Sequence, residues 1–437
     1  MATEILYSWG PGESRLAVVR DGRLADLVLV RPELLAGAVI LGRVVEVAHK
    51  LGAVFVDIGQ DKPGFLSAKG LTQGAAVLVQ VKADAQGGKG CALTSDVSLA
   101  GRCLAYSPFR PGLNVSRKLS DEKRDRLLGW MEPLMQEGEG VVVRTHATTA
   151  DKSELEFELS QLRADWADIQ TRAAQAKAPS VLLRSDPLLR LLSDNPGVAR
   201  VLVDDPQLQA AARARFGGLI EIHRDGPLFD LYDVEDSIAA ACATVVPLAC
   251  GGRVTIEPTA ALTAIDVDSG GATAAEANTQ AVGVIARQLR LRNIAGQMVV
   301  DFVSGGGKGA LFKLVAALKQ AVARDPVATH VIGVTPLGLV EMTRERKGPS
   351  LPELMQERGT SASADAVAFA ALRMALKEAP HRPGRGLAVV VAPDVAAALT
   401  RRSEAVAEAE DRLGRKLVIR ADSTRAREDV QIEEQQP

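Results

Sequence analysis

LTAIDVD at 262–268 and QMVVDFV at 297–303 are two apolar runs that carry acidic residues. Both runs have the length and the β-branched content of strands. Asp266 lies inside the first run and Asp301 inside the second. Because an acid within an apolar strand is costly unless it is paired, each of these two carboxylates is expected to have a partner.

Two kinds of partner are compatible with this pattern. Mg²⁺ binds through one or two carboxylates, several waters and phosphate oxygens, and such an ion can orient a water for attack on a phosphodiester. Arginines are the alternative, because IARQLRLR at 285–292 supplies three of them nearby and structural ion pairs also gather buried acids. The spacing alone gives both interpretations equal weight.

A helix is expected between the two runs, near 275–292. Apolar residues recur there at i, i+3, i+4 and i+7 from Val282, so this side of the helix faces a core. The residues on its other faces, which are predicted to be available to a ligand, are Asn278, Arg287 and Arg290. After the second run, SGGGKG at 304–309 lacks the Ser or Thr that a P-loop has after its lysine, which predicts a mobile loop instead.

The chain has 437 residues, 47% hydrophobic and 24% charged, which is enough for several globular domains. Its formal net charge is −2, so any surface for nucleic acid must be local. The four cysteines form no C-x-x-C pair, which predicts buried thiols of a reducing compartment. Since neither an apolar leader nor a run long enough to span a bilayer is present, a soluble cytoplasmic protein is expected.

Three further modules are predicted around this centre. Residues 4–30 are typical of a small antiparallel sheet with a hairpin at Asp21-Gly22. Residues 38–96 contain short alternating strands with glycines at the corners, which predicts a small closed barrel of the OB type. The C-terminal part is typical of a small α/β module for packing or self-association, with helices over 362–378 and 395–413 and a loose tail from Ser423.

Candidate nucleic-acid contacts lie in the barrel and beyond it. OB barrels bind single strands by stacking bases on aromatic side chains, and Phe55 and Phe65 are each either such a platform or a core residue. Lys89, in the turn GGKG, either contacts phosphate or is simply solvated. A strand at 140–145 ends in Arg144 and Thr145, a pair suited to one phosphate group.

Four stretches, in this order, resemble the catalytic region of the ribonuclease E/G family, which are bacterial endoribonucleases that cut single-stranded RNA in RNA processing and decay. They are IDVDS at 265–269, IARQLRLR at 285–292, VDF at 300–302 and LGLVEMTR at 337–344. The resemblance extends upstream to ILGRV at 40–44, AVFVDIG at 53–59 and GFL at 64–66 for an S1-type barrel, VRT at 143–145 for a 5′-phosphate sensor, and PLFD at 227–230.

The resemblance implies a role for each matching residue. Asp266 and Asp301 match two Mg²⁺-binding acids, and Asp268 lies where the family has a catalytic asparagine, so these three are the predicted catalytic residues. The pair that matches the 5′-monophosphate site is Arg144 and Thr145. The predicted RNA-binding residues are Phe55, Phe65, Lys89, Arg287 and Arg290.

The resemblance also implies a multidomain architecture of α/β and α+β parts. Seven segments are expected: an RNase H-like subdomain split between 1–35 and 206–241, an S1-type OB barrel at 36–118, a 5′-sensor at 119–205, a DNase I-like catalytic subdomain at 242–348, a linker at 349–361 and a small C-terminal α/β domain at 362–437. A homo-oligomer formed through the C-terminal domain is a further hypothesis.

Three departures from the family pattern bear on function. LPELMQERG at 351–359 has no cysteine where the family has a zinc link, so Mg²⁺ is the expected cofactor and zinc is not. Ser304 replaces a usual acid, and Asp268 adds a negative charge beside the metal. The sequence thus predicts an Mg²⁺-dependent endoribonuclease for single-stranded RNA that favours 5′-monophosphorylated ends. The alternatives are a relative that binds RNA without cutting it and, with less support, a phosphatase or a DNA nuclease.

Overall fold

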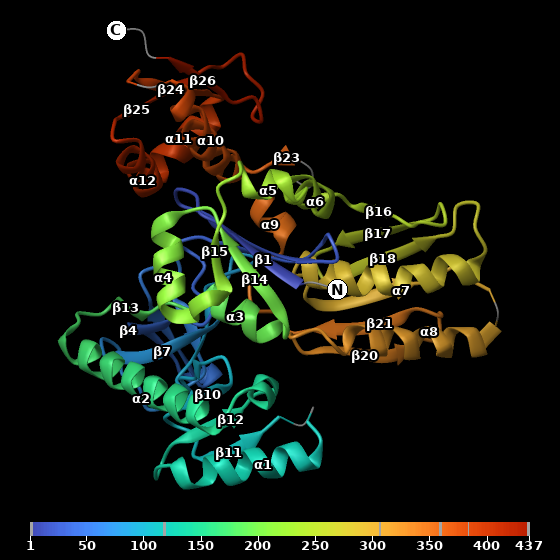
Figure 1. The fold of residues 1–437 in the computed structure, drawn as a ribbon. Coiled ribbons are helices and arrows are strands. Elements are labelled where there is room, and N and C mark those ends of the chain that lie inside the picture. Colours follow the sequence, from blue (N-terminus) through green and yellow to red (C-terminus); the bar gives the residue numbers. More distant parts are fainter. Residues whose placement is uncertain (1–2, 117–118, 306, 358–360, 383, 435–437) are drawn as a thin grey trace. The chain divides into compact units, whose positions relative to one another are not determined.

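The computed structural model describes residues 3–116, 119–305, 307–357, 361–382 and 384–434 (Figure 1). The chain forms two compact units. Unit 1 combines Met1–Pro32 with Ala199–Pro437, and unit 2 is Glu33–Val198. Both units mix helices with sheets, so the expected multidomain α/β and α+β class is confirmed, whereas the finer subdomain boundaries stay predictions.

Unit 1 begins with a five-stranded sheet in the order β15-β14-β1-β2-β3. The predicted hairpin at Asp21-Gly22 is confirmed, because both residues have positive φ (52° and 72°), as the favoured two-residue hairpin turn requires. Later segments complete the sheet, as expected. Its strands are β1 (Thr3–Ser8), β2 (Ser14–Arg20), β3 (Arg23–Val30), β14 (Val198–Val203) and β15 (Ile220–Ile222), and the helices that follow the last two are α4 (Pro206–Phe216), the short 3₁₀ turn Gly217–Leu219, α5 (Leu228–Leu231) and α6 (Val234–Cys242).

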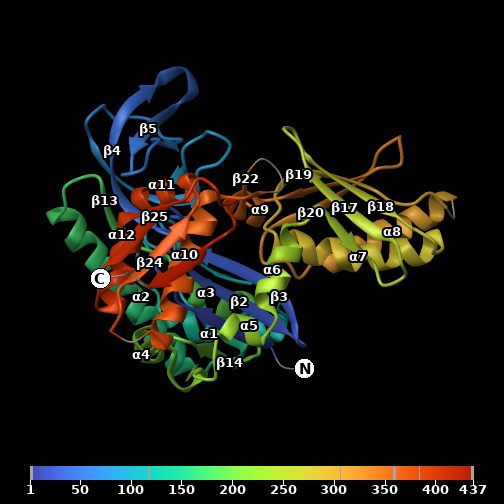
Figure 2. The ribbon, with the colours of Figure 1, turned by 90° about the horizontal axis from the view of Figure 1, so that it is seen from above.

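The second sheet of unit 1 has six strands in the order β16-β17-β18-β19-β21-β20. They are β16 (Val245–Pro247), β17 (Arg253–Pro258), β18 (Thr263–Asp268), β19 (Gly296–Asp301), β20 (Thr329–Val334) and β21 (Val340–Arg344). Helices α7 (Ala274–Leu291) and α8 (Gly307–Val322) pack against one face of this sheet (Figures 1 and 2). The opposite face carries the exposed residues of the strands. We call it the open face.

One expectation near this sheet is wrong. The glycine-rich stretch was expected to remain a loop through residue 309, but α8 already begins at Gly307; residue 306 lies outside the described part of the chain. The segment predicted as a linker, 349–361, contains α9 (Leu351–Met355) and the short strands β22 (Gln356–Glu357) and β23 (Ser361–Ala362). Ser350 and Glu353 form a capping box that starts α9, and residues 358–360 are not described.

The C-terminal part of unit 1 is the predicted small α/β module. Its central strand is buried along its whole length, as expected for a strand covered on both faces. The expected helix over 395–413 is two helices, because the backbone leaves the helical conformation at Arg402 (φ −91°, ψ 41°). The expected loose tail is also wrong over 431–434, where a strand pairs with the central one. The elements are α10 (Ala364–Glu378), the 3₁₀ turn Ala379–His381, β24 (Leu387–Val391), α11 (Pro393–Arg401), α12 (Ser403–Leu413), β25 (Leu417–Ala421) and β26 (Gln431–Glu434).

Unit 2 contains the predicted barrel. Its strands are β4 (Val39–Ala48), β5 (Ala53–Asp57), β6 (Gly64–Leu66), β7 (Ala76–Ala83) and β8 (Ala92–Thr94), with a 3₁₀ turn at His49–Leu51. Pairing of β4 with both β5 and β7 closes the five strands into a barrel, which is consistent with an OB fold. The strand β13 (Ser180–Leu183) adds to the other part of β4. The apolar side chains that point inward form a separate core for this barrel.

A second sheet in unit 2 has the order β11-β12-β10-β9. Its strands are β9 (Leu99–Ala100), β10 (Leu104–Ser107), β11 (Gly112–Val115) and β12 (Gly140–Val143). The long helix α2 (Lys152–Gln175) starts at a capping box of Asp151 and Glu154. The remaining elements are α1 (Asp121–Met131), α3 (Pro187–Asp194) and the 3₁₀ turns Glu132–Leu134 and Thr145–Thr149.

The cysteines and the helices agree with what composition indicated. All four cysteines are free thiols, two of them buried and two partly buried. Within the described part of the chain, none of the helices is long and apolar enough to cross a membrane.

Candidate active site

The two acids that the sequence singled out lie side by side on the open face. Strands β18 and β19 are parallel neighbours, and their register pairs Asp266 with Asp301. On β18, Ile265 and Val267 point into the core, so the alternation of a strand turns Asp266 outward. On β19 the same alternation turns Asp301 outward. The structure therefore brings together two carboxylates that lie far apart in the sequence.

Neither the side chain of Asp266 nor that of Asp301 forms a hydrogen bond or an ion pair with any other residue that the structure describes. The structural ion pair with the helix arginines, which the sequence left open, is therefore not formed. Like charges opposite each other on neighbouring strands destabilise a sheet, so this pair is suited to a cation.

The donor set at this position fits Mg²⁺. Among the described residues, no three His, Cys, Asp or Glu side chains gather in a cluster that could hold a metal, so Asp266 and Asp301 would be the only acidic ligands there. Mg²⁺ typically uses one or two carboxylates and fills its other positions with water and phosphate oxygens. The open face leaves room for both, because Asp266 and Asp301 are exposed.

The third predicted acid, Asp268, is held differently. Its Oδ2 accepts a hydrogen bond from the Nη2 of Arg253 at 2.5 Å, and its Oδ1 accepts one from the backbone N–H of Gly270 at 2.8 Å. Arg253 starts β17 and is the cross-strand partner of Asp268. Both carboxylate oxygens are thus engaged, and the sequence reasoning missed Arg253 although the β17–β18 hairpin could have indicated the pair.

The expectation that Asn278 is available to a ligand is wrong. Asn278 is buried, its Nδ2 donates to the carbonyl of Val303 at 2.9 Å, and its Oδ1 accepts from the N–H of Val303 at 2.9 Å. This double hydrogen bond joins α7 to the segment directly after Asp301. Asn278 therefore helps to fix the end of β19, where one of the two acids lies.

The two helix arginines are also engaged rather than free. Arg287 donates from Nε and Nη2 to the carbonyl of Leu24 at 3.1 and 2.7 Å, and Arg290 pairs with Asp26 at 2.9 Å. Both contacts join α7 to β3, a packing that the helical pattern could not reveal. The expectation that these side chains are unconstrained is therefore wrong, while their predicted contact with RNA is untested.

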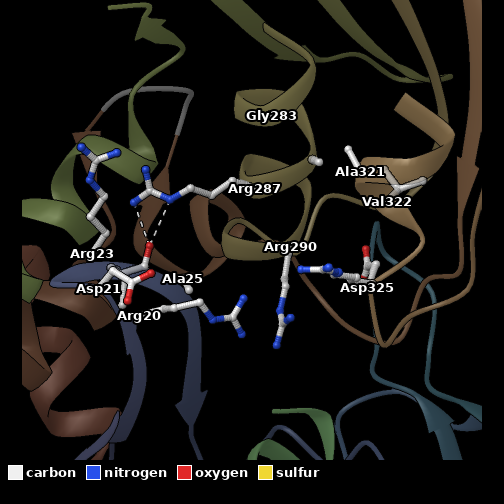
Figure 3. A pocket seen from close by; sticks show the side chains of 13 residues that line it. Arg20, Asp21, Arg23, Ala25, Gly283, Arg287, Arg290, Ala321, Val322 and Asp325 are labelled. Carbon is white, nitrogen blue, oxygen red and sulfur yellow. Dashed lines mark hydrogen bonds between the residues drawn. The ribbon is translucent and has the colours of Figure 1, made fainter. Parts of the chain in front are cut away.

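Arg287 and Arg290 nevertheless line a hollow of about 670 Å³, which we call the arginine hollow (Figure 3). Figure 3 shows the guanidinium of Arg23 beside that of Arg287. Burial, and then the charge of Arg23, lower the pKa of Arg287. The charged residues of the hollow are Arg20, Asp21, Arg23, Arg287, Arg290, Arg324 and Asp325. Because α7 and α8 supply its walls, the hollow lies on the helix-covered side of the sheet, away from the acid pair.

In unit 2 the predicted phosphate pair follows β12 directly. Arg144 donates from Nη1 to the carbonyl of Gly101 at 3.1 Å, which holds the base of its guanidinium. The hydroxyl of Thr145 lies 3.3 Å from that of Ser116, which the sequence reasoning missed because it comes from another strand end. The structure thus gathers an arginine and two hydroxyls at one end of this sheet.

The barrel places its two phenylalanines side by side. Phe55 and Phe65 are cross-strand partners on β5 and β6, with ring centroids 5.9 Å apart and an edge-to-face angle of 70°. Phe65 is 40% exposed and neither ring belongs to the barrel core, so the interpretation of Phe65 as a core residue is wrong. Lys89 is exposed in the turn that pairs Gln86 with Lys89.

Comparison with known proteins identifies the family of this chain. A sequence profile of the ribonuclease E/G family matches residues 98–347, which include Arg144 and both acids. The chain belongs to the ribonuclease E/G family. Its resemblance to this family, stated from the motifs, is thereby confirmed, and the family is one of endoribonucleases that generally need a divalent metal.

Relatives in this family match most of the chain. It is 30% identical to ribonuclease G of Salmonella typhimurium (strain SL1344), over 97% of each protein. It is 29% identical to ribonuclease G of Escherichia coli (strain K12), over 96% of this chain and 97% of that protein. The match to ribonuclease E of Nostoc sp. (strain PCC 7120) is 34% identical and covers 77% of this chain but only 55% of that protein.

Proposed function

We propose that this chain is an Mg²⁺-dependent endoribonuclease that cuts single-stranded RNA on the open face of the six-stranded sheet. The observation that carries the proposal is the exposed cross-strand pair of Asp266 and Asp301, which has no counter-cation among the described residues. Asp266 and Asp301 would hold the ion. When bound, Mg²⁺ supplies a polarised water and stabilises charge that develops on the phosphate. The expected products are a 3′-hydroxyl and a new 5′-phosphate.

The preference for 5′-monophosphorylated RNA is part of the proposal. Arg144 and the hydroxyls of Thr145 and Ser116 would bind the terminal phosphate, since guanidinium and hydroxyl donors suit phosphate oxygens. A 5′-hydroxyl offers no such charge, so it should bind more weakly. Pre-binding one end of the strand would raise the local concentration of RNA at the acid pair.

Further RNA contacts are proposed outside these two sites. The exposed edge of Phe65, with Phe55 beside it, offers a stacking surface, and Lys89 offers a phosphate contact. On the helix side, Arg287 and Arg290 contribute to the arginine hollow, where cations outnumber acids. Assembly through the C-terminal domain and a cytoplasmic location stay predictions.

One cleavage experiment tests the proposal. A short single-stranded RNA, carrying either a 5′-monophosphate or a 5′-hydroxyl, is incubated with the full chain in Mg²⁺ and then in EDTA, beside DNA of the same sequence. We expect cleavage that requires Mg²⁺, is faster on the 5′-monophosphorylated RNA and does not occur on DNA. Cutting in EDTA would contradict the role of the acid pair.

The alternative is a relative that binds RNA without cutting it. The engagement of both Asp268 oxygens favours it, because this acid cannot serve a water or an ion without leaving Arg253 or Gly270. In the same experiment, RNA binding without cleavage in Mg²⁺ would establish this alternative.

A further inference from the structure

The ion pair of Arg253 and Asp268 lies on the same face as the acid pair. Asp268 follows Asp266 by two positions on β18, so both side chains point to the open face. Two residues along a strand span roughly 7 Å, a distance that an arginine side chain can bridge. Arg253 is 58% exposed and Asp268 39%, so the pair is accessible to a ligand.

The backbone holds this pair in place. A Cβ at Gly252 would lie 2.5 Å from the carbonyl oxygen of Asp268, and a Cβ at Gly270 would lie 2.5 Å from that of Gly251. Gly270 also has a φ of +54°, which favours glycine. The turn before Arg253 therefore packs directly on the backbone after Asp268, and only glycines allow this close approach.

Arg253 reduces the negative charge of the open face near the acid pair. Asp266, Asp268 and Asp301 carry three negative charges, and the exposed Glu257 and Glu341 lie on the same face. A divalent ion and Arg253 together neutralise the charge of the three aspartates, so Arg253 reduces the repulsion that an incoming phosphodiester, itself −1, would meet. Asp268 occupies one of the five N–H donors of the guanidinium, and the others are available for phosphate oxygens.

We propose that Arg253, positioned by Asp268, contacts the phosphate that lies over Asp266 and Asp301. Arg253 is then a substrate-binding residue of the open face, and Asp268 is a positioning residue that acts through it. This inference rests on the proposed function, since it assumes that the phosphodiester lies at the acid pair. It assigns Asp268 a role other than binding the ion or orienting the water.

The inference is tested with wild type, Arg253→Gln, Asp268→Asn and the double variant, and two further variants serve as a partial rescue and a control. RNA affinity is measured first with Ca²⁺ in place of Mg²⁺, so that a divalent cation can occupy the acid pair, and a gel verifies that the RNA stays intact during the assay. Arg253→Gln should weaken binding about tenfold, the value of one charge-assisted hydrogen bond. Arg253→Lys keeps the charge without the planar fork and should recover part of the affinity. The control is Lys313→Gln, an exposed lysine on α8, which should bind RNA like wild type.

Cleavage in Mg²⁺ supplies a readout that a structural role would not give. Arg253→Gln should raise KM for RNA about tenfold and, because the face is more negative, lower the Mg²⁺ concentration for half-maximal rate. In an otherwise wild-type chain, Asp268→Asn should reduce kcat/KM because it releases Arg253. In the Arg253→Gln background the same change should increase kcat/KM, because it removes an unbalanced charge.

The results distinguish this inference from the proposed function. RNA binding without cutting by wild type would contradict the proposed function alone. Equal RNA affinity of wild type and Arg253→Gln, or an Asp268→Asn effect of the same sign in both backgrounds, would overturn the inference alone. Unchanged melting temperatures of the variants show that a loss of binding is not a loss of fold.

Discussion

Two groups of charges in unit 1 are arranged in opposite ways. Near the N-terminus, one fully buried carboxylate, Glu13, accepts hydrogen bonds from Arg15 and Arg31 at 2.7 Å and from Arg373 at 3.1 Å. On the open face, two exposed carboxylates, Asp266 and Asp301, lie opposite each other, and no arginine of the described chain pairs with either of them. The buried group satisfies its charge inside the protein, because an unpaired charge there is very costly. Water solvates both carboxylates of the exposed pair, so they need no protein partner and are available to bind a ligand.

The same contrast explains where each group can act. The Glu13 cluster joins β2 and the end of β3 to α10 of the C-terminal module, and Arg31 also stacks on the ring of Phe369 at 5.1 Å. The charged groups of this cluster pair with each other and hold these elements together. The acid pair holds nothing together, since neither carboxylate has a described partner. Removing a charge should therefore cost stability in the first group and activity in the second.

The largest expected effect is at the acid pair. Asp301→Asn removes one of two ion ligands, so we expect cleavage to fall by about 10³-fold or more. RNA affinity should stay within about threefold of wild type, because other contacts bind the strand. Stability should be equal or slightly higher, since a like-charge pair is relieved. Cleavage rates, filter binding and thermal melting measure the three quantities, and a joint loss of binding and cleavage would contradict the metal role.

The buried cluster should show the reverse pattern. Glu13→Gln leaves the buried Arg15 and Arg31 and the partly buried Arg373 without this carboxylate, so the free energy of unfolding should fall by about 3–5 kcal/mol. Denaturant titration measures this loss, and RNA cleavage by the protein that remains folded should be near normal. The matched control is Glu235→Gln, because Glu235 contacts Arg15 from a half-exposed position. If Glu13→Gln lowered the free energy of unfolding as little as Glu235→Gln does, the contrast between the buried cluster and the acid pair would be contradicted.

The cluster also predicts a pH dependence. Burial alone would raise the pKa of Glu13, but Arg15, Arg31 and Arg373 lower it to about 2. One carboxylate does not balance three arginines, and burial and the charge of Arg15 lower the pKa of Arg373 to about 10. Because the folded pKa of Glu13 lies below its ordinary value of 4.5, its contribution is present above that pH and is lost as pH falls toward about 2. Glu13→Gln should flatten this acid limb of the stability curve.

The sequence predicted the acid pair but not the buried cluster, for a physical reason. Asp266 and Asp301 each interrupt a local apolar strand, and parallel β-α-β order places such strands side by side. Glu13 and Arg373 are 360 positions apart, and no local pattern records that α10 packs on the N-terminal sheet. The expectation that Arg287, Arg290 and Asn278 are unconstrained is wrong for the same reason, because helical periodicity shows which face of a helix is apolar but not what packs on the other faces.

Another acid, Asp84 in unit 2, sharpens the comparison because it is desolvated and no arginine among the described residues hydrogen-bonds to it. Burial raises the pKa of Asp84 to about 6, although its Oδ1 accepts the N–H of Leu35 at 2.6 Å. The folded pKa lies above the ordinary value of 3.8, so stability should fall as pH rises from about 4 through about 6. Asp84→Asn keeps an acceptor for Leu35, removes this pH dependence and should gain on the order of 2 kcal/mol above pH 7.

Denaturant titrations of unit 2 stability at about pH 5 and about pH 7.5 measure the Asp84 effect. The control is Asp61→Asn, an exposed acid of the same unit, which should leave the pH dependence unchanged. A gain that is equal at both pH values would contradict the desolvation of Asp84. Confirmation would place Asp84 between the two groups compared above: it is partly buried, whereas Glu13 is fully buried, and no arginine hydrogen-bonds to it among the described residues.

The arginine hollow gathers positive charge, whereas the acid pair gathers negative charge. Substitutions in the hollow should give the smallest effect. Arg23 and Arg324 are exposed on its rim. Replacing both with Gln should weaken binding of a long RNA several-fold at low salt, and it should reduce the slope of log affinity against log salt by about 1.4, the value for two contacts to a single strand. Arg213→Gln with Lys313→Gln removes the same charge from exposed positions outside the hollow. An equal loss of affinity in both double variants would mean that the hollow attracts RNA only through net charge. A loss confined to the Arg23 and Arg324 variant would identify the hollow as an RNA-binding site, on the helix-covered side of the sheet.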